Sequence, residues 1–317
     1  LNEGLNMRLL KFLCATVLLA IPVAALADAR DVPGSAEWYL HIDLDKTRSE
    51  DAGQAVYDWF RAEALDEVRD EAGIDVDKEV SRLTAFSVAG QGPVVVVEGK
   101  FSQETHDKIM AIIAAEGDIS PLKASGRKYY RIGDDGEVNI KGEDGNVDIT
   151  IDSLEDGGWI SMDIRNKILF TGNEEQMKAL LANKGRVPRG SNNNDALLVL
   201  TAEKTLLQAG MNSGLVEDDG DTDWDSNILR NTEQIAFLVA AAANKLAIEA
   251  RLITTEPEMA ESLASVARGL ISLASFDDSM EPEAVAVLQG TRVEAKGNSL
   301  SLSLAVDPSL VVRTLEN

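Results

Sequence analysis

Apolar positions that recur with period 2 or with period 3.6 divide the chain into strands and helices. Alternation over Trp38–Asp43 predicts a strand, and the spacing then changes to about 3.6 over residues 50–64, which predicts a helix. Two β-rich runs, Leu83–Ala89 and Pro93–Gly99, flank Gly90-Gln91-Gly92 and predict a hairpin. The first 100 residues are therefore expected to contain three strands and one helix.

The same order of elements occurs twice. A helix at Glu104–Ala115 follows the first hairpin, and a second hairpin and a helix complete the order βα, ββα, ββα. From Ala196 the order begins again. The remaining predicted elements are strands 159–164 and 167–171, helix 174–181, strand 196–200, helix 202–211, strands 234–241 and 246–253, helix 256–273, strands 291–295 and 300–306, and a terminal helix from Pro308.

This order predicts an α+β fold of two tandem domains related to the ferredoxin-like fold, with mainly antiparallel sheets and helices packed on one face. The first domain is expected at 36–183, with an acidic insertion at about 117–157. Residues 184–194 are polar, broken by Gly and Pro, and predict a linker, and 195–317 form the second domain. Two unrelated α+β domains with a shared element order remain the alternative.

The N-terminal segment has the features of a secretory signal peptide. Arg8 and Lys11 precede an uncharged run from Phe12 to Ala27, which ends in Ala-Leu-Ala. Residues 1–27 are expected to be removed before Asp28, with 1–6 upstream of the true start at Met7. An uncleaved anchor, which would need roughly 20 apolar residues, is the alternative. Cleavage predicts a periplasmic or secreted protein without a stable membrane anchor.

Cysteine content and net charge narrow the chemistry further. Cys14, the only cysteine, lies in the signal peptide, so the mature chain would have no disulfide, no cysteine nucleophile and no thiolate metal site. The formal net charge of −24 disfavours nucleic acid and anionic lipid faces, and it favours cations and basic partners. A solvated acidic surface without a specific ligand explains the same composition.

The densest acidic segment, Glu217–Asn227, resembles part of a calcium loop. Carboxylates alternate along it, and Ca²⁺ takes six to eight oxygen ligands. Trp224 stands where an EF-hand has Gly, and Arg230 where it has Glu, so an exposed, repelling loop is the other interpretation. No other cofactor is expected. The candidate ligands are Asp219, Asp221, Asp223 and Asp225.

No group of residues predicts a catalytic centre. The two histidines, His41 and His106, lie on different elements without metal-ligand spacing, and they are interpreted as packed or surface side chains. Ser125 and Lys128 satisfy Ser-x-x-Lys, but this motif needs the start of a helix, and here it leads into a predicted strand. It is interpreted as a chance match.

Several short runs carry a resemblance to a known group of proteins. They are residues 37–44 (EWYLHIDL), 73–75, 79–80, 83–86 and 95–101 (VVVEGKF). Over residues 36–185 the chain resembles uncharacterised exported bacterial proteins with a duplicated α+β domain. The resemblance implies export and fold, and it implies no reaction or catalytic residue.

The sequence as a whole favours an exported, soluble, non-catalytic protein of the cell envelope that acts as a binding or scaffolding module. Its partner would be an envelope protein or a small ligand, and the oligomeric state is not specified. One alternative is a calcium-binding or adhesion-type protein that uses loop 217–227. Another is a carboxylate-dependent hydrolase of envelope glycans, because two carboxylates suffice for such chemistry.

Overall fold

The structure is a computed structural model that describes residues 36–116, 119–132, 139–141, 148–150, 158–186, 196–205, 228, 230–276 and 282–316. Within these ranges, no helix is long and apolar enough to cross a membrane. The elements of the first part are β1 (Ala36–Asp43), α2 (Leu44–Ser49), α3 (Asp51–Phe60), the π-helical turn η2 (Arg61–Leu65), α4 (Asp66–Ala72), α5 (Val76–Glu79), β2 (Val80–Val88), β3 (Gly92–Gly99), α6 (Gln103–Glu116), β4 (Ile119–Ala124), β5 (Arg127–Ile132), β6 (Asn139–Lys141), β7 (Asp148–Thr150), β8 (Gly158–Ile164), β9 (Lys167–Thr171) and α7 (Glu174–Ala182). The later elements are β10 (Ala196–Glu203), β11 (Thr232–Ala242), β12 (Lys245–Thr254), α10 (Pro257–Ala274), α11 (Pro282–Gln289), β13 (Arg292–Lys296), β14 (Ser299–Val306) and α12 (Pro308–Glu316).

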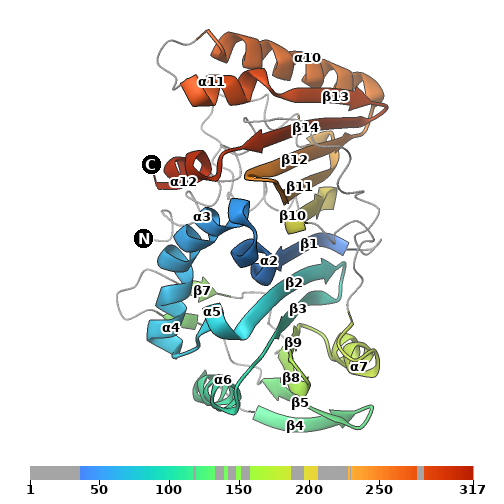
Figure 1. The fold of residues 1–317 in the computed structure, drawn as a ribbon. Coiled ribbons are helices and arrows are strands. Elements are labelled where there is room, and N and C mark those ends of the chain that lie inside the picture. Colours follow the sequence, from blue (N-terminus) through green and yellow to red (C-terminus); the bar gives the residue numbers. More distant parts are fainter. Residues whose placement is uncertain are drawn as a thin grey trace. The chain divides into compact units, whose positions relative to one another are not determined.

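The described strands form one 12-stranded sheet and one two-stranded sheet, and this corrects the predicted fold class. The order in the large sheet is β13-β14-β12-β11-β10-β1-β2-β3-β9-β8-β5-β4, with β6 and β7 paired separately (Figure 1). The prediction of two ferredoxin-like domains is therefore wrong. In that fold an intervening strand separates the first two strands of the split βαβ unit, whereas β1 and β2 are neighbours here.

The local pairings that the sequence predicted are confirmed. β2 pairs antiparallel with β3, β8 with β9, and β13 with β14. Hairpins are encoded by adjacent strands and the turn between them, so the periodicity detects them directly. Helix 202–211 was predicted after residue 200, but β10 continues to Glu203, and residues 206–211 lie outside the described ranges.

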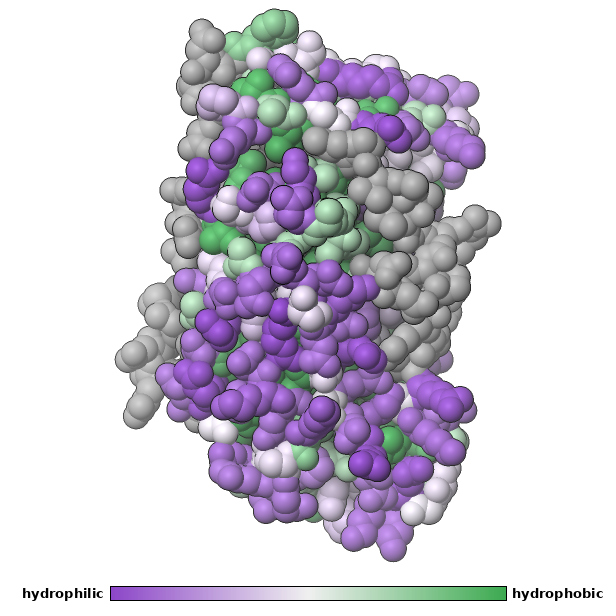
Figure 2. Space-filling view, viewed as in Figure 1, coloured by the Kyte–Doolittle hydropathy of each residue, from purple (hydrophilic) through white to green (hydrophobic). Residues whose placement is uncertain are grey.

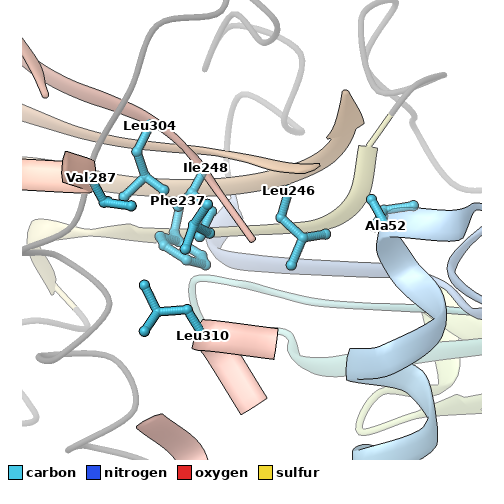
Figure 3. Packing of buried hydrophobic residues seen from close by; sticks show 9 residues of the cluster. Ala52, Phe237, Leu246, Ile248, Val287, Leu304 and Leu310 are labelled. Carbon is cyan, nitrogen blue, oxygen red and sulfur yellow. The ribbon is translucent and has the colours of Figure 1, made fainter. Parts of the chain in front are cut away.

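The chain divides into two compact units, which we describe separately. Among the described residues, unit 1 comprises 40–45 and those between 57 and 186, and unit 2 comprises 36–39, 46–56 and those between 196 and 316. In unit 2, side chains from β11, β12 and β14 pack against α11 and α12 in one apolar cluster (Figure 3). Its members include Phe237, Ile248, Val287, Leu304 and Leu310.

Helices cover both faces of the sheet in unit 1, which also corrects the prediction of helices on one face. Ile168 and Tyr130 pack in a cluster with residues of α6. The side chains next to them in the sequence, Tyr129 and Leu169, point to the opposite face of the sheet. There Tyr129 Oη donates to Glu174 Oε1 of α7 at 2.7 Å, and Leu169 is fully buried. Both faces of β9 are apolar because both are covered, and α6 and α7 lie on different sides of β8 and β9 (Figure 1).

Candidate functional site

Two tight turns meet at one end of the sheet in unit 1. The β4–β5 turn contains Ser125 and Gly126, both with positive φ (50° and 74°), and the β8–β9 turn contains Asn166 with φ 63°. Asp163 joins the two turns. Its carbonyl oxygen accepts from Arg127 Nη1 at 3.0 Å, and its Oδ2 accepts from the Lys128 backbone N–H at 2.8 Å. The two turns therefore form one continuous surface.

A third segment, which follows α7, reaches the same end. Lys167, the first residue of β9, donates from Nζ to the Gly185 carbonyl oxygen at 2.7 Å. Gly185 is buried with φ 63°, and a Cβ atom there would lie 2.9 Å from Lys167 Cδ and 3.4 Å from Ile164 Cδ1. Glycine is thus required where this segment approaches the strands. The contact brings Lys184 and Arg186 beside the β8–β9 turn.

Cationic side chains gather on these three segments, and we call them together the basic end. Arg127 is half-buried and the other five are exposed; Figure 2 shows hydrophilic residues over most of the visible surface of unit 1 (Figure 2). None of the six forms an ion pair with another residue in the described ranges. The basic end consists of Lys123, Arg127, Lys128, Arg165, Lys184 and Arg186.

The six unpaired cations of the basic end lie on adjoining segments, whereas many other cations of the described chain form ion pairs. Acidic residues outnumber basic ones by 54 to 30, so a cation has many possible partners. Two other cations of unit 1 have such partners: Arg69 pairs with Asp66 at 2.7 Å, and Lys108 pairs with Glu104 at 2.8 Å. Six cations with no such partner on three adjoining segments therefore form a local reversal of the protein's charge.

Two lysines of the basic end face each other directly. Lys123 on β4 and Lys128 on β5 are cross-strand partners in the antiparallel register. Like charges placed opposite one another in a sheet are destabilising, and no described carboxylate pairs with either side chain. An anion between the two ammonium groups would relieve this repulsion, so the pair is better suited to holding a negative ligand than to stabilising the fold.

A ladder of four charged side chains supports the basic end from within the sheet. Arg82 Nε lies 3.1 Å from Asp43 Oδ2, and Arg82 Nη1 lies 3.2 Å from Glu98 Oε2. Glu98 Oε1 in turn lies 2.6 Å from Lys167 Nζ, the atom that also holds the Gly185 carbonyl. The ladder crosses β1, β2, β3 and β9 and fixes the segment that carries Lys184 and Arg186.

Electrostatics within the ladder are balanced. Burial alone would lower the pKa of Arg82, but the carboxylates of Asp43 and Glu98 outweigh it and raise that pKa above its ordinary value. Two carboxylates and two cations alternate, so the ladder contributes no net charge. The positive charge of this end of the sheet therefore comes from the six cations of the basic end and not from the supporting network.

The metal ligands that the sequence suggested are not tested by the described residues. Asp219, Asp221, Asp223 and Asp225 lie outside the described residues, so the calcium loop stays a prediction. No group of three or more potential metal ligands occurs among the residues that the structure describes.

The histidines and the Ser-x-x-Lys motif have structural surroundings. His41 is buried, and its Nδ1 lies 2.8 Å from Thr84 Oγ1, whereas the ring of His106 packs at 6.2 Å from that of Phe101. Ser125 lies in the β4–β5 turn and Lys128 on the strand after it, as expected for a chance match. Lys128 nevertheless belongs to the basic end.

Sequence reasoning missed the basic end because its members are far apart in the chain. Lys123 and Arg186 are separated by more than 60 positions, in a segment interpreted as an acidic insertion and in the predicted linker. The available signal was the presence of Lys and Arg beside Ser125-Gly126, at the predicted hairpin turn Arg165-Asn166 and at the start of the predicted linker. Only the register of β4, β5, β8 and β9 shows that these turns share one end.

Comparisons with known proteins give structural likeness only. No family model and no curated protein matches the chain. Crystal form IV of TP0453 is similar with 10% sequence identity and a TM-score of 0.48, and the match covers 93% of this chain and 98% of that one. Crystal form III of TP0453 matches with 8% identity and a TM-score of 0.46, over 92% of this chain and 99% of that one.

Proposed function

We propose that the chain is an exported, non-catalytic protein of the cell envelope that acts as a binding or scaffolding module, with the basic end as its binding surface. The observation that carries this proposal is the group of six cations without ionic partners in the described part of a chain with net charge −24. The ammonium and guanidinium groups of these side chains are cationic, so the surface attracts anions.

The partner is a molecule with several negative charges. The cations come from three segments of the backbone that are fixed by hydrogen bonds, so the backbone positions that carry them are set before any ligand binds. Preorganisation lowers the entropic cost of binding. Outside the basic end the protein repels the same ligand, which restricts binding to one place on the surface.

Binding of a soluble polyanion tests the proposal. Mature protein that starts at Asp28 is titrated with polyphosphate by calorimetry, and the variant Lys123→Gln/Lys128→Gln/Arg165→Gln is compared with it. An exposed charge pair contributes up to about 1 kcal/mol, so loss of three cations is expected to weaken binding roughly 10- to 100-fold. Binding should also weaken steeply between 0.05 and 0.5 M salt, on the order expected from screening.

A matched control removes the same number of charges elsewhere in unit 1. Arg61→Gln/Lys78→Gln/Lys108→Gln changes three cations that pair with Asp58, Asp75 and Glu104. It should bind polyphosphate nearly as well as wild type. Equal weakening by both variants would mean that net charge alone governs binding, and the basic end would lose its assignment.

The envelope location has its own test. Expression of the full sequence in a bacterial host and N-terminal sequencing of the exported protein should give a chain that begins at Asp28. A product that keeps residues up to Ala27 would contradict cleavage between Ala27 and Asp28.

A further inference from the structure

We infer that the basic end docks on the surface of an anionic phospholipid bilayer, so that the protein lies at a membrane with this end of unit 1 facing the headgroups. The inference rests on the proposed function and names the source of the negative charge.

The cations are spread over an area too wide for one small anion. Four of them lie at the ends of β4, β5 and β8, and Lys184 and Arg186 flank Gly185, which contacts the first residue of β9; these four strands are successive neighbours in the sheet. Neighbouring strands are about 4.8 Å apart, so the segments span roughly 15 Å before the side chains are extended. A single phosphate could contact only a fraction of the six, whereas a headgroup layer offers negative charge across the whole area.

The arrangement also suits charges that can move. Lys123 and Lys128 face each other on one side of β4 and β5, whereas Arg127 points to the opposite side and donates to the Asp163 carbonyl oxygen. A ligand with rigidly spaced charges would have to match this uneven pattern. Lipid headgroups diffuse laterally, so each cation can recruit its own phosphate without a complementary shape.

Charge complementarity then fixes which part of the molecule approaches the bilayer. The six cations and Asp163 sum to +5, so the rest of the chain carries −29 of the formal net charge of −24. At physiological ionic strength the Debye length is about 8 Å, which screens repulsion from charges far from the bilayer while the basic end is in contact. The excess of negative charge on the rest of the chain opposes its approach to anionic headgroups.

Vesicle sedimentation tests the inference. Mature protein is mixed with vesicles of 70% phosphatidylcholine and 30% phosphatidylglycerol, or of phosphatidylcholine alone. Each Lys or Arg near an anionic membrane contributes about fivefold to partitioning, so Lys123→Gln/Lys128→Gln/Arg165→Gln should bind the anionic vesicles about 100-fold more weakly. The control Arg61→Gln/Lys78→Gln/Lys108→Gln should remain within a fewfold of wild type, and phosphatidylcholine vesicles should not bind.

A variant that tests for an apolar membrane contact is included because α10 exposes Leu270 and Leu273, with 49% and 71% of their surfaces accessible. Leu270→Ser/Leu273→Ser should leave vesicle binding unchanged. If this variant loses binding while the triple glutamine variant retains it, the contact is apolar and the inference is overturned. Circular dichroism of each variant establishes that the change in binding does not reflect unfolding.

A labelling experiment reads the orientation directly. The mature chain has no cysteine, so Ser125→Cys in the β4–β5 turn and Gln91→Cys in the β2–β3 turn each introduce one site for a fluorophore. These turns lie at opposite ends of the sheet, because the eight residues of β3 separate the Gly92 end from the Gly99 end. Lipids with a nitroxide on the headgroup should quench the label at residue 125 strongly and the label at residue 91 weakly.

The outcomes separate this inference from the proposed function. Binding of polyphosphate through the basic end without binding of anionic vesicles overturns the bilayer surface and leaves a soluble polyanion as partner. Equal quenching at both labels also overturns it. Loss of both polyphosphate and vesicle binding in the wild-type protein overturns the proposed function itself.

Discussion

The carboxylate of Glu98 is the central member of the ladder beneath the basic end, and its neutralisation should destabilise unit 1. Glu98 Oε2 lies 3.2 Å from Arg82 Nη1, and Oε1 lies 2.6 Å from Lys167 Nζ. Glu98→Gln keeps the size of the side chain and removes the charge. It leaves two cations beside a neutral amide, with Asp43 as the remaining carboxylate of the ladder.

The expected loss of stability follows from burial. The side chains of Glu98 and Lys167 are only 15% and 18% exposed, which places them between a surface pair and a fully buried one. Surface pairs contribute about 0–1 kcal/mol, and removal of one member of a buried pair costs about 3–5 kcal/mol. We expect Glu98→Gln to lower the free energy of unfolding by about 2 kcal/mol. For a unit of this size that is roughly 4–8 °C in Tm.

Urea unfolding followed by tryptophan fluorescence and by circular dichroism measures this change, and a double-mutant cycle with Lys167→Met isolates the coupling. The cycle should give a coupling of about 1 kcal/mol or more, because the two side chains are in direct contact. Glu175→Gln is the matched control; its partner is the exposed Lys178 at 2.8 Å, and its unfolding curve should stay close to wild type. A coupling near zero, or equal effects of Glu98→Gln and Glu175→Gln, would refute the ladder's supporting role.

Two further substitutions test the segments around the basic end. Gly185→Ala should lower the free energy of unfolding by about 2 kcal/mol, and Gly126→Ala should lower it by about 1 kcal/mol. Both substitutions impose a left-handed backbone on alanine, but only the Cβ atom at 185 would meet close neighbours. Equal losses of stability in thermal unfolding would contradict this packing. The hydrogen bond from the Tyr129 hydroxyl is the largest cause of the lowered pKa of Glu174. Tyr129→Phe removes this bond and should lower the free energy of unfolding by about 1 kcal/mol at pH 7. A carboxyl with a lowered folded-state pKa stabilises the fold above its unfolded pKa, and this stability is lost as pH falls through the folded pKa. The difference between wild type and Tyr129→Phe should therefore shrink below about pH 4.5, and a difference that is constant from pH 7 to pH 3 would contradict the hydrogen bond's role.

Local elements could be predicted from the sequence, and the strand order could not. The period of 3.6 in the apolar residues of α10 predicts a helix. The glycine-containing turn between the apolar runs of β2 and β3 predicts a hairpin. β4 contains Pro121 and Lys123 and lies at the edge of the large sheet, so it lacks the apolar alternation of a half-buried strand. Such a strand can be recognised only once its pairing with the neighbouring strand is known.

The repeated element order was a weak guide for a physical reason. The order of elements along a chain is compatible with several sheet topologies, and the choice among them depends on contacts between distant residues. The uninterrupted apolar run of β9 already indicates a strand that is buried on both faces. That run conflicted with the expectation of helices on one face, and it was the more reliable of the two signals.

The basic end illustrates the same limit for the candidate site. Each of its residues is individually an ordinary charged residue in or near a turn, and a sequence window around any one of them contains at most three members of the group. Their significance depends on the ion pairs that they lack among the described residues and on the surplus of carboxylates elsewhere. Both properties emerge only after the register of the strands is known.

Lysine footprinting is the most direct test of the claim that the basic end is the binding surface. Mature protein is acetylated briefly with and without polyphosphate, and the modification of each lysine is quantified by mass spectrometry. Our account predicts strong protection of Lys123, Lys128 and Lys184, with Lys78 and Lys108 reacting equally in both samples. Protection that is uniform over all five lysines, or strongest at Lys78 and Lys108, would contradict it.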